Sequence, residues 1–559
     1  MPNNKLKILL VNIPEVDFDE TKINYTEVLL LKAPSIPLGI ASISAYMKNM
    51  SNHEIYLYDV YLDGFRMYEE NKDKKILLEL IEKKINAIMP DVIGISALMI
   101  VNYKWVHHIA RVAKRINPQV KIIVGGGYAS SMPQRILDDI NIDFIVLGEG
   151  EESFLTITNE NFAKEKLIHL DGIGFRSKSG EKIINRKSSF ISDVSALSFF
   201  DWKGINLENY LQHTKDRMVS YITSRGCPFG CSFCSTYLMW GKKFRPLSAQ
   251  RVLDELDYLV SEYSIGHIEF RDDNITLDKK RTLDIFNGFI KRGYNFKWTC
   301  PNAMAISTLD RNMVEIIKRS GCDTIIIAIE SGSERVIKDI IHKPVDKNKV
   351  REIVRVVKDL GLKIHTAFIV GFPGETKADI EETRNFILEL QCDWNQISIA
   401  TPFPGTEMYD ICEKNNYFVN SNFDLERFRY GFANIRTDDF DEKWIKEKAY
   451  GINIEANFLK NHNFDDDPQQ AIVEFNDRLS SYPKHLIAIF CLAYAYKRAG
   501  EKKKTQDTLQ RACNLIKNEA DIYQTYKKYI DPSNPIFEDY FKLLEEHNTQ
   551  ESNLNILKK

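Results

Sequence analysis

Short apolar runs alternate with helical segments along most of the chain, and this alternation limits the possible folds more than any other feature. The runs of a first series lie at residues 7–12, 54–59, 92–96, 121–125 and 144–148. Near-continuous apolar strands separated by helices are typical of a parallel sheet that is covered on both faces. Residues 1–155 are therefore predicted to form a doubly wound, Rossmann-like α/β domain, with its ligand at the carboxyl ends of the strands.

The alternation resumes after residues 156–215, which are predicted to be a linker with room for one hairpin. Expected strands of the second series lie at residues 220–223, 267–271, 297–300, 324–329, 363–370 and 396–400. Each is followed by a helix-like segment, and six such βα units in order predict a partial (βα)6 barrel over residues 216–423.

The strands stop beyond residue 424, and residues 424–559 are predicted to form a helical C-terminal domain. The segments 469–479, 486–498 and 504–516 have amphipathic helical spacing. Their Ala, Tyr and Gly pattern resembles a tetratricopeptide-type helix pair, yet one and a half repeats look the same as any αα-hairpin. Both interpretations of this domain stay open.

Charge and hydropathy exclude two classes of partner. The 559 residues include 75 Lys and Arg against 78 Asp and Glu, so no basic field is present to attract a nucleic acid. The longest apolar stretch, residues 486–496, is shorter than the ~18–20 residues that cross a bilayer, and the N-terminus lacks the apolar core of a signal peptide. The sequence predicts a soluble, cytoplasmic protein with no membrane span.

Three of the nine cysteines lie close together, directly after the first expected barrel strand: Cys227, Cys231 and Cys234. The other six are scattered singly, as in proteins of a reducing compartment. These spacings let a loop, turning at Gly226 and Gly230, present three thiolates to one [4Fe–4S] cluster and leave one iron open. A zinc knuckle is the alternative, but zinc would need a fourth Cys or His close by in the sequence.

With a strand before the loop and the aromatic Phe233 before its last cysteine, this segment resembles the radical S-adenosylmethionine (SAM) superfamily. The resemblance implies that the three cysteines hold the cluster and that the open iron chelates SAM. One electron from the reduced cluster would then cleave SAM to a 5′-deoxyadenosyl radical, which abstracts hydrogen from carbon. A one-electron reductant such as flavodoxin or ferredoxin is implied as a partner.

Acidic residues and glycines stand at the expected barrel strand ends, where a barrel places its ligand groups. The candidate cofactor-binding residues there are Asp272, Asp273, Glu330, Ser331, Gly371 and Gly374. By resemblance, Glu330 or Ser331 would bind the ribose hydroxyls of SAM, and the glycines would let backbone approach its adenosyl group. Taken singly, each acidic residue fits a helix N-cap nearly as well, since each precedes a helix.

Small residues follow the strands of the first domain, and their order before a radical SAM barrel resembles the cobalamin-dependent branch of that superfamily. These candidate cobalamin-binding residues are Gly39, Ser96, Gly125, Gly126, Gly127, Gly148, Glu149 and Gly150. A dinucleotide domain is the alternative, but no G-x-G-x-x-G follows the first strand. An Asp-x-His-x-x-Gly motif is also missing there and the first histidine is His53, so cobalamin is expected base-off and without a histidine ligand.

The resemblance implies an enzyme that moves a methyl group from SAM, through methylcobalamin, to an unactivated carbon of a small-molecule, lipid or peptide substrate. Oxidation, cyclisation, ring contraction or carbon–carbon bond formation without net methyl transfer is the first alternative. A second is a docking module that binds a protein partner through its helical tail and carries a vestigial barrel. The three intact cysteines count against that module, and no substrate-side catalytic residue stands out.

Overall fold

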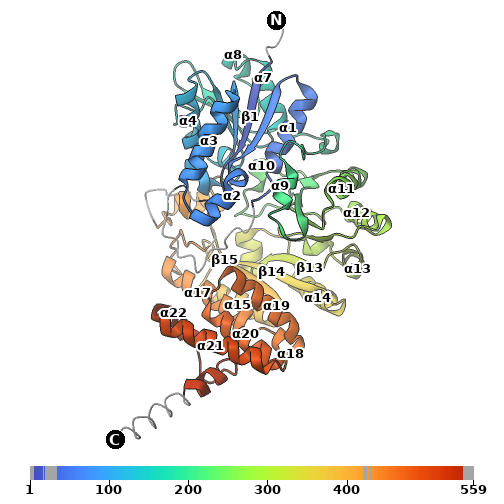
Figure 1. Ribbon diagram of the computed structural model, residues 1–559, viewed down its shortest axis with the longest axis vertical. Helices are drawn as coiled ribbons and strands as arrows, with labels where there is room; N and C mark the ends of the chain where they lie inside the picture. The colour runs from blue at the N-terminus through green and yellow to red at the C-terminus, as the bar shows by residue number, and fades with distance from the viewer. Residues whose placement is uncertain (1–4, 17, 19–33, 420–424, 429–430, 545–559) are drawn as a thin grey trace.

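The computed structural model describes residues 5–16, 18, 34–419, 425–428 and 431–544, in three regions that follow one another in chain order (Figure 1). The first region is built on a seven-stranded sheet of order β2-β1-β3-β4-β5-β6-β7, in which the first five strands pair in parallel. Its strands are β1 (Lys7–Asn12), β2 (Glu54–Asp59), β3 (Val92–Ser96), β4 (Lys121–Gly125), β5 (Phe144–Val146), β6 (Ile173–Arg176) and β7 (Lys182–Asn185). The antiparallel hairpin β6–β7 comes from the expected linker and extends this sheet.

Helices cover both faces of the first sheet, because successive side chains of a strand point to opposite faces. Leu9 and Val11 of β1 pack in one apolar cluster with Trp105, whereas Ile8 and Leu10 pack in another with Phe154. The helices are α1 (Leu38–Met50), α2 (Val60–Asn71), α3 (Lys75–Ile88), α4 (Tyr103–Ile116), α5 (Gly127–Ser131), α6 (Pro133–Ile136), α7 (Glu151–Asn159) and α8 (Lys164–Leu167), with a 3₁₀ turn η1 (Ile100–Asn102) before α4. The predicted Rossmann-like architecture is confirmed.

The second region is the predicted partial barrel. Its parallel strands are β8 (Met218–Tyr221), β11 (His267–Phe270), β12 (Lys297–Thr299), β13 (Thr324–Glu330), β14 (Lys363–Val370) and β15 (Trp394–Ile399). Bridges from Trp298 to Cys322 and from Met304 to Ile327 join the two three-stranded sheets. The helices between the strands are α11 (Ala249–Tyr263), α12 (Lys279–Arg292), α13 (Arg311–Arg319), the π-helix η5 (Val336–Ile341), α14 (Lys347–Asp359) and α15 (Lys377–Leu390).

The third region is helical and protects the open edge of the barrel. Its elements are α17 (Glu442–Ile454), the π-helix η7 (Glu455–Leu459), α18 (Asn463–Asp466), α19 (Pro468–Ser481), α20 (Leu486–Arg498), α21 (Lys502–Asn518) and α22 (Ala520–Tyr526). The side-chain amide of Asn457 accepts from the backbone N–H of Asn395 in β15 (2.8 Å) and donates to its carbonyl (2.7 Å). It thereby replaces the neighbouring strand that an edge would otherwise attract.

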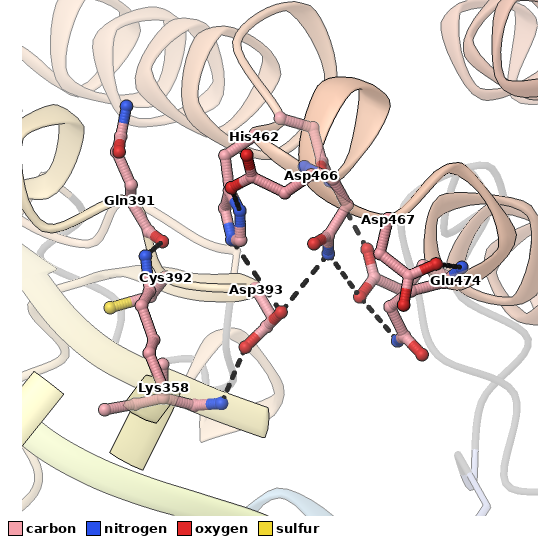
Figure 2. A network of polar contacts seen from close by, with 12 residues as sticks. Lys358, Gln391, Cys392, Asp393, His462, Asp466, Asp467 and Glu474 are labelled. Atoms are coloured by element: carbon pink, nitrogen blue, oxygen red, sulfur yellow. Dashed lines mark hydrogen bonds and ion pairs between the residues drawn. The ribbon is translucent and has the colours of Figure 1, made fainter. Parts of the chain in front are cut away.

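A polar network fastens the helical region to the amino end of β15 (Figure 2). Asp393, just before β15, accepts from the backbone N–H of Ile364 (2.7 Å) and from the amide of Asn463 (3.2 Å). Its carboxylate also faces His462, whose other ring nitrogen lies 3.0 Å from Asp466. Across the described residues, none of the helices combines the length and the hydropathy that a membrane span requires.

Candidate active site

The loop that carries Cys227, Cys231 and Cys234, here called the cysteine loop, begins after the short strand β9 (Ser224–Arg225) and leads into α10 (Thr236–Trp240). The chain then returns as β10 (Arg245–Pro246), which pairs antiparallel with β9. Gly226 has a φ of +83°, and a Cβ there would lie 2.3 Å from the carbonyl oxygen of Lys243, so this position needs glycine. Gly230, by contrast, has open space around it and no positive φ. The expected need for glycine therefore holds at Gly226 and is wrong at Gly230.

The three thiols are half-buried and free of disulfides. Burial raises the pKa of Cys227 and of Cys234, and raises that of Cys231 to about 12. Bound iron would reverse this effect, because a coordinating thiol is deprotonated by the metal charge. The described residues include no group of three His, Cys, Asp or Glu side chains that could hold a single metal ion. In a [4Fe–4S] cluster each thiolate binds its own iron, so the donor set fits that group.

The middle of the loop is fixed by Ser232. Its N–H and hydroxyl donate to the carbonyls of Ile341 (3.1 Å) and Ile340 (2.7 Å), and its own carbonyl accepts from Met408 (2.9 Å). The neighbouring Phe233 ring packs at 5.8 Å from Phe372, within an apolar cluster that also contacts Cys231. The loop is thus held between η5 and α16 (Glu407–Lys414).

Asp272 and Asp273 follow β11 but have different surroundings. Asp272 is fully buried and accepts from the N–H (3.0 Å) and the hydroxyl (2.7 Å) of Thr223, so it ties β11 to the start of the cysteine loop. Asp273 accepts from Thr236 (3.2 Å) through one oxygen, whereas the other is buried without a partner among the described residues. Burial raises the pKa of Asp273 to about 6. Asp278 caps α12, so the N-cap alternative is wrong for both residues.

Glu330 ends β13 in a left-handed conformation, with a φ of +72°. Its carboxylate lies 2.7 Å from the Nζ of Lys343, which also donates to the carbonyl of Ala328 (2.8 Å). The positive charge of Lys343 opposes the rise that burial causes in the pKa of Cys231. The hydroxyl of Ser331 is instead buried against Thr383, at 3.0 Å. Of the two expected ribose ligands, Glu330 is therefore the one electrostatically linked to the cysteine loop.

Lys343 was not indicated by the sequence, because a single lysine after a helical segment carries no local signal. The role of Glu375, which closes the turn after β14, was not indicated by the sequence either. Its Oε2 accepts from the N–H of Gly371 (2.5 Å) and of Phe372 (3.0 Å), and burial raises its pKa to about 8. Gly371 and Gly374 have φ angles of +90° and +82°, a conformation that favours glycine.

Glycines at the strand ends of the first region allow close packing of the backbone. A Cβ at Gly126 would lie 2.5 Å from the carbonyl oxygen of Ala97, and a Cβ at Gly127 would lie 2.2 Å from that of Leu98. Leu98 itself is 68% exposed, which places apolar surface at this edge. The remaining small residues expected here lie at the ends of neighbouring elements: Gly39 in α1, at 4.0 Å from the Ser96 hydroxyl when a Cβ is added, and Gly125 at the end of β4.

The loop after β5 contacts the cysteine region directly. Gly148 has a φ of +66°, and a Cβ there would lie 3.3 Å from the carbonyl oxygen of Met239 in α10. Glu149 is 2% exposed as a residue, and its carboxylate accepts from Arg225 (3.0 Å) and Arg245 (2.7 Å). Gly150 precedes α7. The loop of residues 148–150, here called the glycine loop, is therefore in direct contact with the cysteine loop, although Glu149 and Arg225 are 76 residues apart in sequence.

The segment after β15 also contacts the first region. Phe403, Phe418, Leu425 and Phe428 join the apolar cluster of the first region that contains Ile100. Lys104 of α4 pairs with Glu426 at 2.8 Å. This segment thus spans from the barrel to the first region, beside the cysteine loop.

Family models match both regions. A radical SAM superfamily model matches residues 221–387, and a B12-binding domain model matches residues 28–158. The chain is 32% identical over 390 residues to an uncharacterised methyltransferase of Pyrococcus horikoshii, covering 69% of this chain and 80% of that protein. It is 28% identical over 463 residues to cytidylyl-2-hydroxyethylphosphonate methyltransferase of Streptomyces wedmorensis, covering 75% and 86%.

A solved structure has the same fold. The cobalamin-dependent S-adenosylmethionine radical enzyme OxsB matches with a TM-score of 0.65 and 17% identity, covering 94% of this chain and 80% of that one. The expected order of a cobalamin-binding domain, a radical SAM barrel and a helical region is thereby confirmed. The chain belongs to the cobalamin-dependent radical SAM superfamily and is an enzyme.

Proposed function

We propose that the protein transfers a methyl group from SAM, by way of cobalamin, to an unactivated carbon of its substrate. The observation that carries the proposal is the direct contact between the glycine loop after β5 and the cysteine loop. It would let both cofactor sites open into one chamber. Two relatives that are methyltransferases by name support the same reaction.

The residues of the barrel would hold the iron cluster and SAM. Cys227, Cys231 and Cys234 provide the thiolates, and the positive charge of Lys343 partly offsets theirs. The buried oxygen of Asp273 that has no partner among the described residues would accept a hydrogen bond from the amino group of SAM. Glu330, held by Lys343, would accept from the ribose hydroxyls.

The first region would hold cobalamin through backbone and apolar contacts. Gly126 and Gly127 keep side chains out of the strand ends, so backbone amides can approach the phosphate of the nucleotide tail. Leu98 offers apolar surface at the same edge. The sequence after β1 includes no histidine before His53, so we propose that no histidine from this loop ligates cobalt. When bound, the cluster and cobalamin supply one-electron reduction and methyl carriage.

The partners follow from this chemistry. A reductant such as flavodoxin or ferredoxin would deliver the electrons, and the substrate would be a small molecule, a lipid or a peptide. We expect the substrate to bind between the carboxyl-end loops of the two α/β regions, since ligands of both fold types lie there.

Anaerobic turnover tests the proposal. The protein is reconstituted with iron, sulfide and hydroxocobalamin, and products of SAM are followed by mass spectrometry under a strong reductant. We expect both 5′-deoxyadenosine and S-adenosylhomocysteine, and we expect Cys231→Ala to lose 5′-deoxyadenosine. Cys513→Ala, in α21 and far from the loop in sequence, is the control. 5′-Deoxyadenosine without S-adenosylhomocysteine would favour radical chemistry without methyl transfer.

A further inference from the structure

A buried group of four charged side chains joins the first region to the cysteine loop. Arg225, two residues before Cys227, donates through one guanidinium nitrogen to Glu149 (3.0 Å) and through another to Glu151 (2.7 Å). The side chains of these three charged residues are 8%, 1% and 4% exposed. Because two arginines face two glutamates, the group is neutral as a whole.

The second arginine fixes the far end of the same loop. Arg245 pairs with Arg225 across the β9–β10 ladder and donates to Glu149 at 2.7 Å. It also donates to the carbonyl of Trp240 (2.7 Å), and the Arg225 guanidinium lies over the Trp240 ring at 4.9 Å. Both ends of the segment that carries the three cysteines are therefore held by one carboxylate of the first region.

Stability alone does not explain these charges. Desolvation costs buried ions much of what their attraction provides, and apolar residues of similar size often stabilise such a site as well. Ion pairs add directional geometry, because a guanidinium binds carboxylates only in a defined plane. The geometry that they define here is the position of the cysteine loop relative to the loop of Gly148 and Gly150.

The same glycine loop also touches the chain after the cysteines. A Cβ at Gly148 would lie 3.3 Å from the carbonyl oxygen of Met239, five residues beyond Cys234. Glu149 thus contacts the chain before the first cysteine, and its neighbour contacts the chain after the last one. A shift of this loop cannot leave the cysteine loop unchanged.

We infer that Arg225 is a positioning residue that couples the cobalamin site to the cluster site. A filled cobalamin site holds Glu149 and Glu151 in register for Arg225, which in turn holds the loop that begins at Cys227. Each cofactor is then bound more tightly when the other is present, since such coupling is reciprocal. The inference depends on the two cofactors and not on which reaction they perform.

Affinity measurements test the coupling without turnover. The dissociation constant of hydroxocobalamin is measured anaerobically for cluster-loaded protein and for protein whose iron has been removed by a chelator. We expect wild-type protein to bind at least about fivefold more tightly when the cluster is present. In Arg225→Gln the ratio should fall to about one, and Arg225→Lys should restore part of it. By reciprocity, hydroxocobalamin should slow chelator-driven iron loss from wild type but not from Arg225→Gln.

Arg384→Gln is the matched control. Arg384 makes a bidentate pair with Glu455 (2.6 Å for both bonds), which joins the barrel to the helical region, so this variant should keep the wild-type ratio. Equal affinities in loaded and iron-free wild type, or an unchanged ratio in Arg225→Gln, would overturn the inference. If Arg225→Gln fails to retain iron, Glu151→Gln is measured instead, since it removes one of the two carboxylates and should lower the ratio; an unchanged ratio there also overturns it.

Discussion

The barrel has two junctions, and they differ in how deeply their charged groups are buried. Toward the first region the contact is made by buried ion pairs of Arg225 and Arg245 with Glu149 and Glu151. Toward the helical region the edge strand is covered by the neutral amide of Asn457, and the bidentate pair of Arg384 with Glu455 beside it is more exposed, at 28% and 21% of the side chains. Charged groups fix distance and orientation sharply, whereas an amide satisfies backbone groups at lower desolvation cost. The difference indicates that the first junction positions reacting groups and the second completes the fold.

The largest expected effect tests whether the cysteine loop, held by the first junction, can shift its backbone and still function. Gly226→Ala would place a methyl group 2.3 Å from the Lys243 carbonyl at a positive φ. Such strain costs on the order of 1–3 kcal/mol or more, so the loop should move and turnover of SAM should fall roughly 100-fold. Iron content and 5′-deoxyadenosine formation measure this. Gly230→Ala is the control, because its position is open; equal losses in both variants would contradict the assignment.

Removing one charge from the first junction should have the next largest effect. Glu149→Gln leaves Arg245 facing only carbonyl oxygens in a buried site. Breaking a buried pair typically costs about 3–5 kcal/mol. The unfolding transition of the first region and the barrel should therefore move to a lower urea concentration. Lys297→Gln removes the exposed pair with Asp323 and should change stability by less than about 1 kcal/mol. A loss of similar size in both would show that the junction is solvated.

These two junctions also mark the limit of what the sequence predicts. The strands β1 and β3 were predictable because each contains a near-continuous apolar run, whereas in β14 such a run covers only the last four residues. The cysteines and the strand-end residues were predictable because carboxyl ends of parallel strands meet at one edge. Glu149 was expected beside cobalamin, but its carboxylate is bound by arginines that lie 76 and 96 residues away. Pairs at such separation leave no periodic pattern in a single sequence.

The same limit explains smaller differences. Lys343 was missed because its contact with Glu330 depends on how η5 folds the chain between the two residues, which their spacing in the sequence does not show. The hairpin β6–β7 was expected within a linker, but its pairing with β5 depends on the exposed edge of the first sheet. The N-cap of α12 is Asp278, six residues beyond Asp272, because β11 is followed by a longer loop than expected.

Acid should weaken the helical region before it weakens the charged junction. Burial lowers the pKa of His485 to about 4, and its neutral Nδ1 accepts from Ala488 at the start of α20. Between the ordinary value near 6.5 and 4, the unfolded chain binds a proton that the folded chain does not, so stability falls as pH drops through this window. The loss should approach about 3 kcal/mol. The pKa of Glu151 is lowered from its ordinary value of 4.5, so its contribution begins to be lost only below about pH 4.5, after most of the His485 window has been crossed.

Unfolding followed between pH 7 and 4 measures this order. His485→Asn retains a capping group without a titrating ring, so it should flatten the pH dependence of the helical transition. Unchanged pH dependence in this variant would assign the effect to another group, such as His365 in β14, whose pKa burial also lowers to about 4.

The smallest expected effect concerns the amide that covers the edge strand. Asn457→Ala removes both hydrogen bonds to the backbone of Asn395 and leaves an N–H and a carbonyl of the edge strand without partners. Unsatisfied buried groups cost about 1–3 kcal/mol, so the helical region should open more readily, seen as faster amide hydrogen exchange in β15. SAM turnover per folded molecule should stay near the wild-type value, because Asn457 contacts no predicted cofactor residue in the described hydrogen bonds. Asn415→Ala is the control for exchange, because the exposed amide of Asn415 donates to the carbonyl of Ile411 in α16. A loss of turnover as large as that of Gly226→Ala would show that the helical junction also positions the reacting groups, and the contrast between the two junctions would disappear.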